Sequence, residues 1–145
     1  MKFARSKFTM KNPEKYAGLK TPLCRSSWEF VMMRTFDEHP GVEKWASESI
    51  QIPYRDPLTG KYSIYVPDFF VVYIDKDRKK HAEVIEVKPS TQTLREKVGN
   101  NRYNQEQYIK NMAKWEAANN WCKQQGIKFR VINENEIFHQ GNKLR

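Results

Sequence analysis

Three charged residues in strand-like segments are the first candidates for chemistry. Asp68 follows the residues VP and precedes the apolar run FFVVYI, while Glu86 and Lys88 lie on either side of Val87 in the run EVIEVK. Because side chains alternate along a strand, Glu86 and Lys88 project from one face. Burying a carboxylate or an ammonium without a partner costs several kcal/mol, roughly. The pattern therefore predicts that these charges compensate one another.

The chemistry that suits this set is metal-assisted hydrolysis of a phosphodiester. If the strands carrying Asp68 and Glu86 pair, the two carboxylates repel one another unless a cation sits between them. Mg²⁺, or Mn²⁺ in its place, suits such an oxygen-rich site, because it binds one or two carboxylates together with water and substrate phosphate. The ion would lower the pKa of a bound water, and Lys88 would orient that water and offset the developing negative charge.

The same residues have a plainer explanation. Asp68 can be an ordinary residue at the start of a strand, and Glu86 with Lys88 an ion pair on the solvated face of an antiparallel sheet. A Glu-x-Lys triplet alone is common in any sequence and indicates little. The context favours the catalytic interpretation, because the triplet follows a Pro-Asp pair on an apolar strand of a basic chain.

The charge of the chain points to a polyanionic partner. Its 145 residues include 26 Lys and Arg against 17 Asp and Glu, which gives a net charge of +9. Nucleic acid is the usual partner of such a chain, and a basic surface without a special role is the alternative. The cations predicted to bind DNA phosphates beside the site are Arg25, Arg95, Lys97 and Arg102.

Several other classes of protein have little support in the composition. Cys24 and Cys122 lie far apart among apolar residues, which favours reduced core thiols over a disulfide or a metal site. The three histidines are scattered without the spacing of a zinc site. No apolar run approaches the roughly 18 residues of a membrane span, and the first residues lack the apolar segment of a secretory signal. We therefore expect no association with a membrane.

The elements that must position the acids follow from the periodicity. A helix begins at Ser26, where apolar residues recur at helical spacing until Pro40-Gly41. Two strand-like stretches joined by DPLTG predict a hairpin, and the charged DKDRKK returns the chain into a third strand. A long helix then ends at Gly126 and precedes a last strand. The predicted strands cover 48–55, 61–74, 81–88 and 127–138, and the long helix covers 105–125.

These elements predict a single α/β domain. A strand–helix–strand connection is right-handed, so the last strand should lie parallel to the third, beside a three-strand antiparallel meander. The order α-β-β-β-α-β gives a mixed central sheet flanked by helices. We expect a basic N-terminal arm over 1–21, the domain over 22–138 and a short C-terminal tail over 139–145.

The motifs and their order resemble the PD-(D/E)XK nuclease superfamily, whose core is restriction-endonuclease-like. Pro67-Asp68, followed after seventeen intervening residues by Glu86-Val87-Lys88, looks like its signature. The text RSSWEFVMM, IPYRDPLTGK and EVIEVKP is similar to the head completion nucleases of large contractile-tailed phages, and the first helix also resembles that of TnsA-type transposon endonucleases. The resemblance covers roughly residues 22–135.

The resemblance implies a role for each matching residue. Asp68 and Glu86 would be the metal carboxylates, and Glu29 of the first helix would join them as a third acid. The Val87 carbonyl would be a further metal ligand. Lys88 would be the catalytic lysine.

Three residues keep a second explanation or an open position. Ser26-x-x-Glu29 matches a capping box, so Glu29 has a structural role that needs no metal. Glu83 falls on the opposite strand face from Glu86 and is predicted to be a surface acid. Lys114 on the long helix can face the acids or solvent, because helical phase does not decide between them.

The resemblance implies a phage head completion protein with Mg²⁺-dependent DNA endonuclease activity during virion maturation, located in the virion and the host cytoplasm. Its partners would be DNA and phage head, portal or neck proteins. Cutting both DNA strands with one site per chain would call for a homodimer or two successive events. The alternatives are a TnsA-like transposon-end endonuclease, a structural head or neck protein that uses a nuclease fold for binding, and a plain nucleic-acid-binding module.

Overall fold

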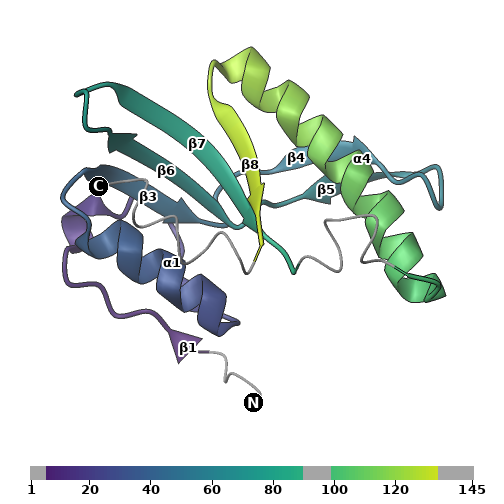
Figure 1. Ribbon diagram of the computed structural model, residues 1–145, viewed down its shortest axis with the longest axis horizontal. Coiled ribbons are helices and arrows are strands. Elements are labelled where there is room, and N and C mark those ends of the chain that lie inside the picture. Colours follow the sequence, from purple (N-terminus) through teal and green to yellow (C-terminus); the bar gives the residue numbers. More distant parts are fainter. Residues whose placement is uncertain (1–5, 90–98, 134–145) are drawn as a thin grey trace.

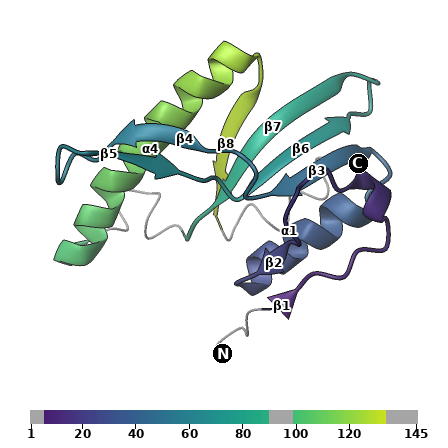
Figure 2. The same cartoon turned by 180° about the vertical axis from the view of Figure 1, so that it is seen from behind.

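The computed structural model describes residues 6–89 and 99–133 (Figures 1 and 2). Its elements in chain order are β1 (Ser6–Lys7), the 3-10 helix η1 (Pro13–Lys15), β2 (Leu23–Cys24), α1 (Ser27–Glu38), β3 (Val42–Ser47), β4 (Ile52–Arg55), β5 (Tyr62–Tyr65), β6 (Phe69–Ile74), β7 (Lys80–Val87), α4 (Arg102–Gln125) and β8 (Lys128–Ile132).

A four-stranded mixed sheet stands at the centre, with the strand order β3-β6-β7-β8. Strands β3, β6 and β7 pair antiparallel, whereas β7 and β8 pair parallel. Helix α4 lies between β7 and β8 in the chain, so the predicted parallel last strand is confirmed (Figure 1). The predicted fold class is also confirmed, because α1, β3, β6, β7, α4 and β8 follow the α-β-β-β-α-β order.

The strands of the meander differ from those predicted. The first strand of the meander is β3 and not 48–55. The sequence pattern does not reveal β3, because a register irregularity between Val42 and Lys44 interrupts the alternation of buried and exposed side chains. The predicted strand 61–74 is two strands, β5 and β6, separated by residues 66–68. Pro67 lies in that break and has no amide hydrogen to donate to a ladder. Strands β4 and β5 form a separate hairpin.

Two apolar cores hold these elements together. The first lies under α1 and contains Phe36 and Trp45, which are fully buried, with Phe69 and Ile85 of the central sheet. The second lies between the β4–β5 hairpin and α4, and Tyr54, Tyr65 and Ala118 are buried in it. Figure 2 shows the hairpin alongside α4, with α1 at the other side of the sheet. The two buried cysteines are free thiols, as predicted.

Capping residues set the ends of both helices. Ser26 is the N-cap of α1 and its side chain accepts a hydrogen bond from the Glu29 amide, while Gly126 ends α4 in the left-handed conformation at φ 74°. On α4, Asn111, Ala118 and Cys122 are buried, whereas Met112 is 36% exposed.

The described part of the predicted N-terminal arm packs along α1 (Figure 1). Phe8 is buried in the first core, and the backbone amides of Lys11 and Asn12 donate to the buried Asp37 carboxylate at 2.8 and 3.0 Å. Residues 6–21 are therefore held by the folded unit and are not a frayed terminus. The domain boundaries at 21 and 138 stay predictions.

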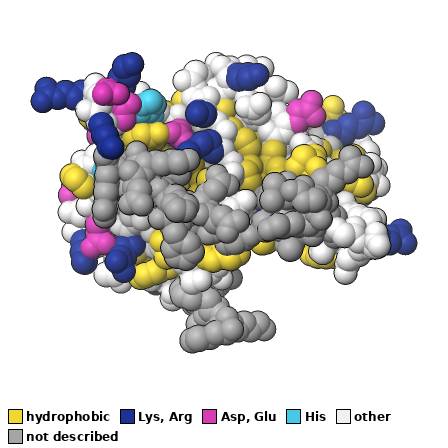
Figure 3. Space-filling view, in the orientation of Figure 1, with side chains coloured by type: hydrophobic (Ala, Val, Ile, Leu, Met, Phe, Trp, Pro, Cys, Tyr) yellow, Lys and Arg dark blue, Asp and Glu magenta, His cyan; other side chains and the backbone are white. Residues whose placement is uncertain are grey.

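The surface carries the charge of the chain around apolar patches. Figure 3 shows Lys and Arg side chains spread around hydrophobic ones on the face that includes α4. The exposed large apolar residues of that helix are Tyr103, Ile109 and Met112. Neither α1 nor α4, the two α-helices within the described ranges, has the length and apolar composition needed to cross a membrane.

Candidate active site

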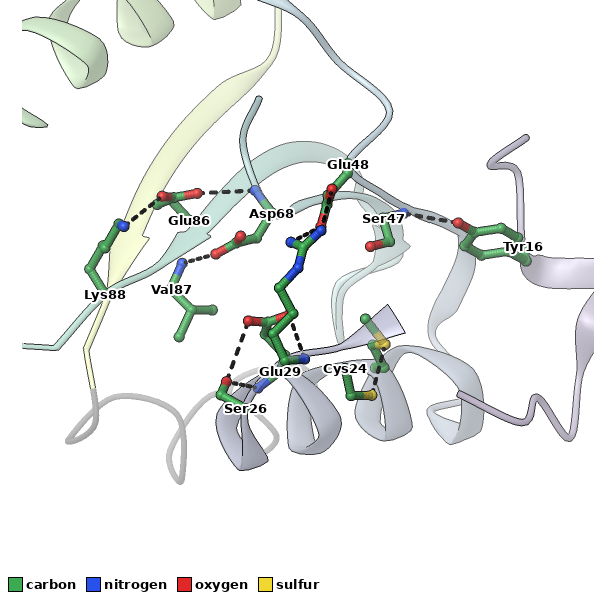
Figure 4. A network of polar contacts seen from close by, with 12 residues as sticks. Tyr16, Cys24, Ser26, Glu29, Ser47, Glu48, Asp68, Glu86, Val87 and Lys88 are labelled. Carbon is green, nitrogen blue, oxygen red and sulfur yellow. Dashed lines mark hydrogen bonds and ion pairs between the residues drawn. The ribbon is translucent and has the colours of Figure 1, made fainter. Parts of the chain in front are cut away.

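Asp68 and Glu86 face one another across two paired strands, as predicted. The β6–β7 register pairs Phe69 with Ile85, so the next residues along, Asp68 and Glu86, come opposite each other. The Asp68 amide donates to Glu86 Oε1 at 3.0 Å, and the Val87 amide donates to Asp68 Oδ2 at 2.8 Å (Figure 4). Each carboxylate is thus fixed by the backbone of the strand that carries the other one.

The two carboxylates form an electrostatically costly pair. Burial raises the pKa of Asp68 well above its usual value, and the Glu86 charge raises it further, against the hydrogen bond from Val87. Burial also raises the pKa of Glu86, against the nearby Lys88 ammonium and the Asp68 amide. Burial therefore disfavours the charged form of both acids, and at Asp68 the charge of Glu86 adds to this effect. A cation placed between the carboxylates would relieve that cost.

Lys88 is the cation that the protein itself supplies to the pair. Its Nζ lies 3.8 Å from Glu86 Oε2, so the prediction that Glu86 and Lys88 share a face is confirmed (Figure 4). The Lys88 amide donates to the Ile132 carbonyl at 3.0 Å, which anchors the residue to β8. The side chain is 30% exposed and can therefore reach a bound molecule.

Glu29 forms only half of the predicted capping box, because its carboxylate accepts from the amide of Arg25 and not from that of the N-cap residue Ser26. Its amide donates to Ser26 Oγ at 3.1 Å, and its Oε1 accepts a hydrogen bond from the Arg25 amide at 3.3 Å. Burial raises the pKa of Glu29, and the Glu29 charge in turn raises the pKa of Asp68. Among the described residues, no three His, Cys, Asp or Glu side chains are gathered closely enough to hold a metal ion. A metal role for Glu29 stays a prediction.

Arg25, predicted to bind DNA phosphate, is engaged within the protein. Its guanidinium binds both carboxylate oxygens of Glu48, with Nη2 3.1 Å from Oε2. Glu48 follows β3 at a φ of 49°, which is uncommon for a residue other than glycine, and its amide donates to the Asp68 carbonyl at 2.9 Å. Sequence reasoning missed Glu48, because it assigned this residue to a strand and no motif marks it.

Of the other predicted phosphate-binding residues, Arg102 pairs within α4 and two lie outside the described residues. Arg102 is the first residue of α4, and its Nε lies 3.0 Å from Glu106 Oε1 on the exposed side of the helix. Arg95 and Lys97 lie outside the described residues. Their roles stay predictions.

Lys114 and Tyr65 lie beside the acid pair from the α4 side. Burial is the main cause that raises the pKa of the Tyr65 hydroxyl, and the charges of Glu86 and Asp68 raise it further. Lys114 Nζ lies 5.7 Å from the centre of the Tyr65 ring. The structure therefore turns Lys114 toward the site, which helical phase alone did not decide.

The prediction that Glu83 is a surface acid is wrong. Glu83 is 3% exposed, forms an ion pair with Arg130 and accepts a hydrogen bond from the Tyr73 hydroxyl. It lies on the opposite face from Glu86, as predicted, but the neighbouring strands β8 and β6 supply Arg130 and Tyr73 as its polar partners there. The signal was available in Arg130, a charged residue inside the apolar strand KFRVI.

The donor set fits a hard divalent ion. Asp68 and Glu86 offer carboxylate oxygens from a largely buried position, where burial raises the pKa of both acids. Mg²⁺ is commonly held by one or two carboxylates, with water and phosphate completing its octahedron. The pair therefore meets the requirement without a third acid.

The fold and the site together define a class of protein, namely mixed α/β domains with two acids and a lysine at the adjoining ends of two strands. Residues 39–134 match the model of the TnsA-like endonuclease N-terminal family, and the chain belongs to this family. The chain is also 31% identical over 141 residues to the head completion nuclease of Enterobacteria phage T4, covering 90% of this chain and 91% of that protein. The predicted resemblance to this group of nucleases is confirmed.

Proposed function

We propose that this protein is a Mg²⁺-dependent DNA endonuclease that acts while a phage head is completed. The observation that carries the proposal is the Asp68–Glu86 pair, with each carboxylate held by the opposite strand and Lys88 beside it. The match to an endonuclease family and the similarity to a head completion nuclease support the reaction class and the setting.

Each residue of the site has a distinct role in hydrolysis. Asp68 and Glu86 would hold the ion, and the Val87 carbonyl and Glu29 would be further oxygen donors. When bound, Mg²⁺ supplies charge neutralisation and a more acidic water. Lys88 orients the attacking water and offsets negative charge on the phosphate. The water loses a proton to solvent and its oxygen bonds to phosphorus, while one P–O bond of the DNA backbone breaks and the leaving oxygen takes up a proton from solvent.

Assignment to the PD-(D/E)XK superfamily is part of the same proposal. It is supported by Pro67-Asp68 and Glu86-Val87-Lys88 at the ends of two paired strands and by the α-β-β-β-α-β order of the elements. A TnsA-like role at transposon ends uses the same chemistry. Similarity over 91% of a head completion nuclease favours the phage setting. The partners in that setting are DNA and the phage head, portal or neck proteins.

The decisive experiment measures DNA cleavage. Supercoiled and linear DNA are incubated with the protein in Mg²⁺, Mn²⁺ or EDTA, beside Asp68→Ala and Lys88→Ala variants. We expect cleavage with either metal and none in EDTA. Both variants should lose activity by about 10²–10⁴-fold, because each removes a charge that acts on the reacting phosphate or its water.

A surface variant controls for general effects of substitution. Glu116→Gln changes an exposed acid on α4 and should cleave like the wild-type protein. Circular dichroism checks that all variants are folded. DNA left intact by the wild-type protein in every metal would overturn the proposal and favour a structural role in the virion.

A further inference from the structure

Helix α4 presents two lysines one turn apart in different electrostatic settings. Lys110 Nζ lies 3.6 Å from Asp56 Oδ2, so its charge is compensated within the protein. Lys114 makes no ion pair with a carboxylate in the described part of the chain. Its Nζ instead lies over two aromatic rings, 5.8 Å from the centre of Tyr54 and 5.7 Å from that of Tyr65.

The aromatic contacts hold the Lys114 ammonium on the side of the acid pair. Tyr54 and Tyr65 are buried in the core between the β4–β5 hairpin and α4. Two residues separate Tyr65 from Asp68 in sequence, and the charges of Asp68 and Glu86 both act on the Tyr65 hydroxyl. Lys114 therefore lies on the same side of the site as Glu86, although Lys114 belongs to α4 and Glu86 to the sheet.

Lys88 and Lys114 are close enough to affect one another. Burial lowers the pKa of Lys114, the charge of Lys88 lowers it further, and the charge of Glu86 opposes these effects. Glu86 lies 3.8 Å from Lys88, and the charge of Asp56, which pairs with Lys110, also acts on Lys114. Two ammonium groups therefore lie beside the acid pair, and Lys114 has no carboxylate partner of its own in the described part of the chain, a setting suited to a phosphate that reaches the acids.

We propose that Lys114 binds a backbone phosphate of the DNA strand being cut, next to Lys88. This inference rests on the proposed function, because it takes DNA as the substrate of the same site. The tyrosine rings hold the ammonium in place while it lacks a ligand, and a phosphate oxygen completes its coordination. Lys110, one turn away, is excluded from this role by Asp56.

The test measures DNA binding without cleavage. A fluorescent duplex is titrated in EDTA at several salt concentrations with the wild-type protein, Lys114→Gln, Lys114→Met and Lys114→Arg, and with Lys110→Gln as the matched control. A lost phosphate contact reduces the slope of log affinity against log salt by about 0.9. We expect that reduction for Lys114→Gln and Lys114→Met, and wild-type slopes for Lys114→Arg and Lys110→Gln.

The two neutral variants guard against a purely structural effect. Met keeps the apolar stem over the tyrosine rings, so a packing role alone would leave its slope unchanged. Unchanged slopes in both neutral variants, or an equal reduction in Lys110→Gln, would overturn the inference. A wild-type protein that binds DNA with the expected slopes but cleaves none in Mg²⁺ would instead contradict the proposed function alone.

Discussion

At the scale of single residues, backbone amides of opposite strands determine where the two acids point. The amide of Asp68 holds Glu86, and the amide of Val87 holds Asp68, so neither carboxylate depends on a long flexible side chain for its position. The arrangement keeps two like charges together in the folded protein. It should therefore leave a signature in stability as well as in catalysis.

The first residue-scale prediction concerns pH. The pKa of Asp68 is raised in the folded protein, so the folded state binds more protons than the unfolded state between the two pKa values. The free energy of unfolding of the metal-free protein should fall as pH rises from the ordinary carboxyl range through the raised pKa. Asp68→Asn should flatten this dependence and raise the free energy of unfolding of the metal-free protein at neutral pH by on the order of 1 kcal/mol, because it removes one of two buried like charges.

Urea unfolding in EDTA across a pH series measures this effect. Glu116→Gln, an exposed acid on α4, is the control and should keep the wild-type pH dependence. If Asp68→Asn unfolds with the same pH dependence as the wild-type protein, the folded state tolerates both charges.

The second residue-scale prediction concerns the buried Glu83–Arg130 ion pair, which lies on the face of β7 opposite to Glu86. Glu83 and Arg130 are 5% and 21% exposed in their side chains, so removing one partner leaves a charge with little water. Arg130→Met should lower the free energy of unfolding by about 3–5 kcal/mol. Adding Glu83→Gln should recover part of that loss, because it removes the orphaned charge.

An exposed ion pair provides the comparison. Arg34 and Glu38 are 68% and 36% exposed on α1, and Arg34→Met should cost less than about 1 kcal/mol. Thermal or urea unfolding distinguishes the two pairs. Equal losses at Arg34 and Arg130 would show that burial does not govern the second pair.

At the scale of elements, the N-terminal cap of α1 includes Glu29, the residue predicted to join the acid pair. Ser26 Oγ accepts a hydrogen bond from the Glu29 amide, and the Glu29 carboxylate accepts one from the Arg25 amide. Ser26→Ala should therefore lower the free energy of unfolding by about 1 kcal/mol. Ser63→Ala, at an exposed position of β5, is the control for losing a serine hydroxyl. Equal stability of Ser26→Ala and wild type would show that the cap contributes nothing.

The elements also show what sequence patterns could and could not predict. Helix α1 and the β6–β7 pair were predictable, because their apolar spacing and turns are regular. Strand β3 was not, since a bulge near Val42 breaks its alternation. The sequence pattern assigned the β4–β5 hairpin to the central sheet, because the apolar residues of β5 and β6 follow one another closely and only a short break at Pro67 separates the two strands. Local patterns cannot decide which neighbour a strand pairs with.

At the scale of the whole molecule, the topology was predictable although one strand was misassigned. The order of helices and strands and the right-handed crossover restrict the fold to few alternatives, so the acids came together on the correct strands. Asp68, Glu86 and Lys88 were predictable for that reason. Glu48, and the orientation of Lys114, were not, because both depend on how distant segments pack around the pair.

The crossed hydrogen bonds between Asp68 and Glu86 also make the acid pair a test of correct folding. A slip of one residue in the β6–β7 pairing would place Ile85 or Val87 opposite Asp68 and turn Glu86 to the other face of the sheet. A compact chain with a misaligned β6–β7 pairing would thus contain all residues of the site, but Asp68 and Glu86 would not face one another. During refolding, the acid pair can form only when this ladder has found its final alignment.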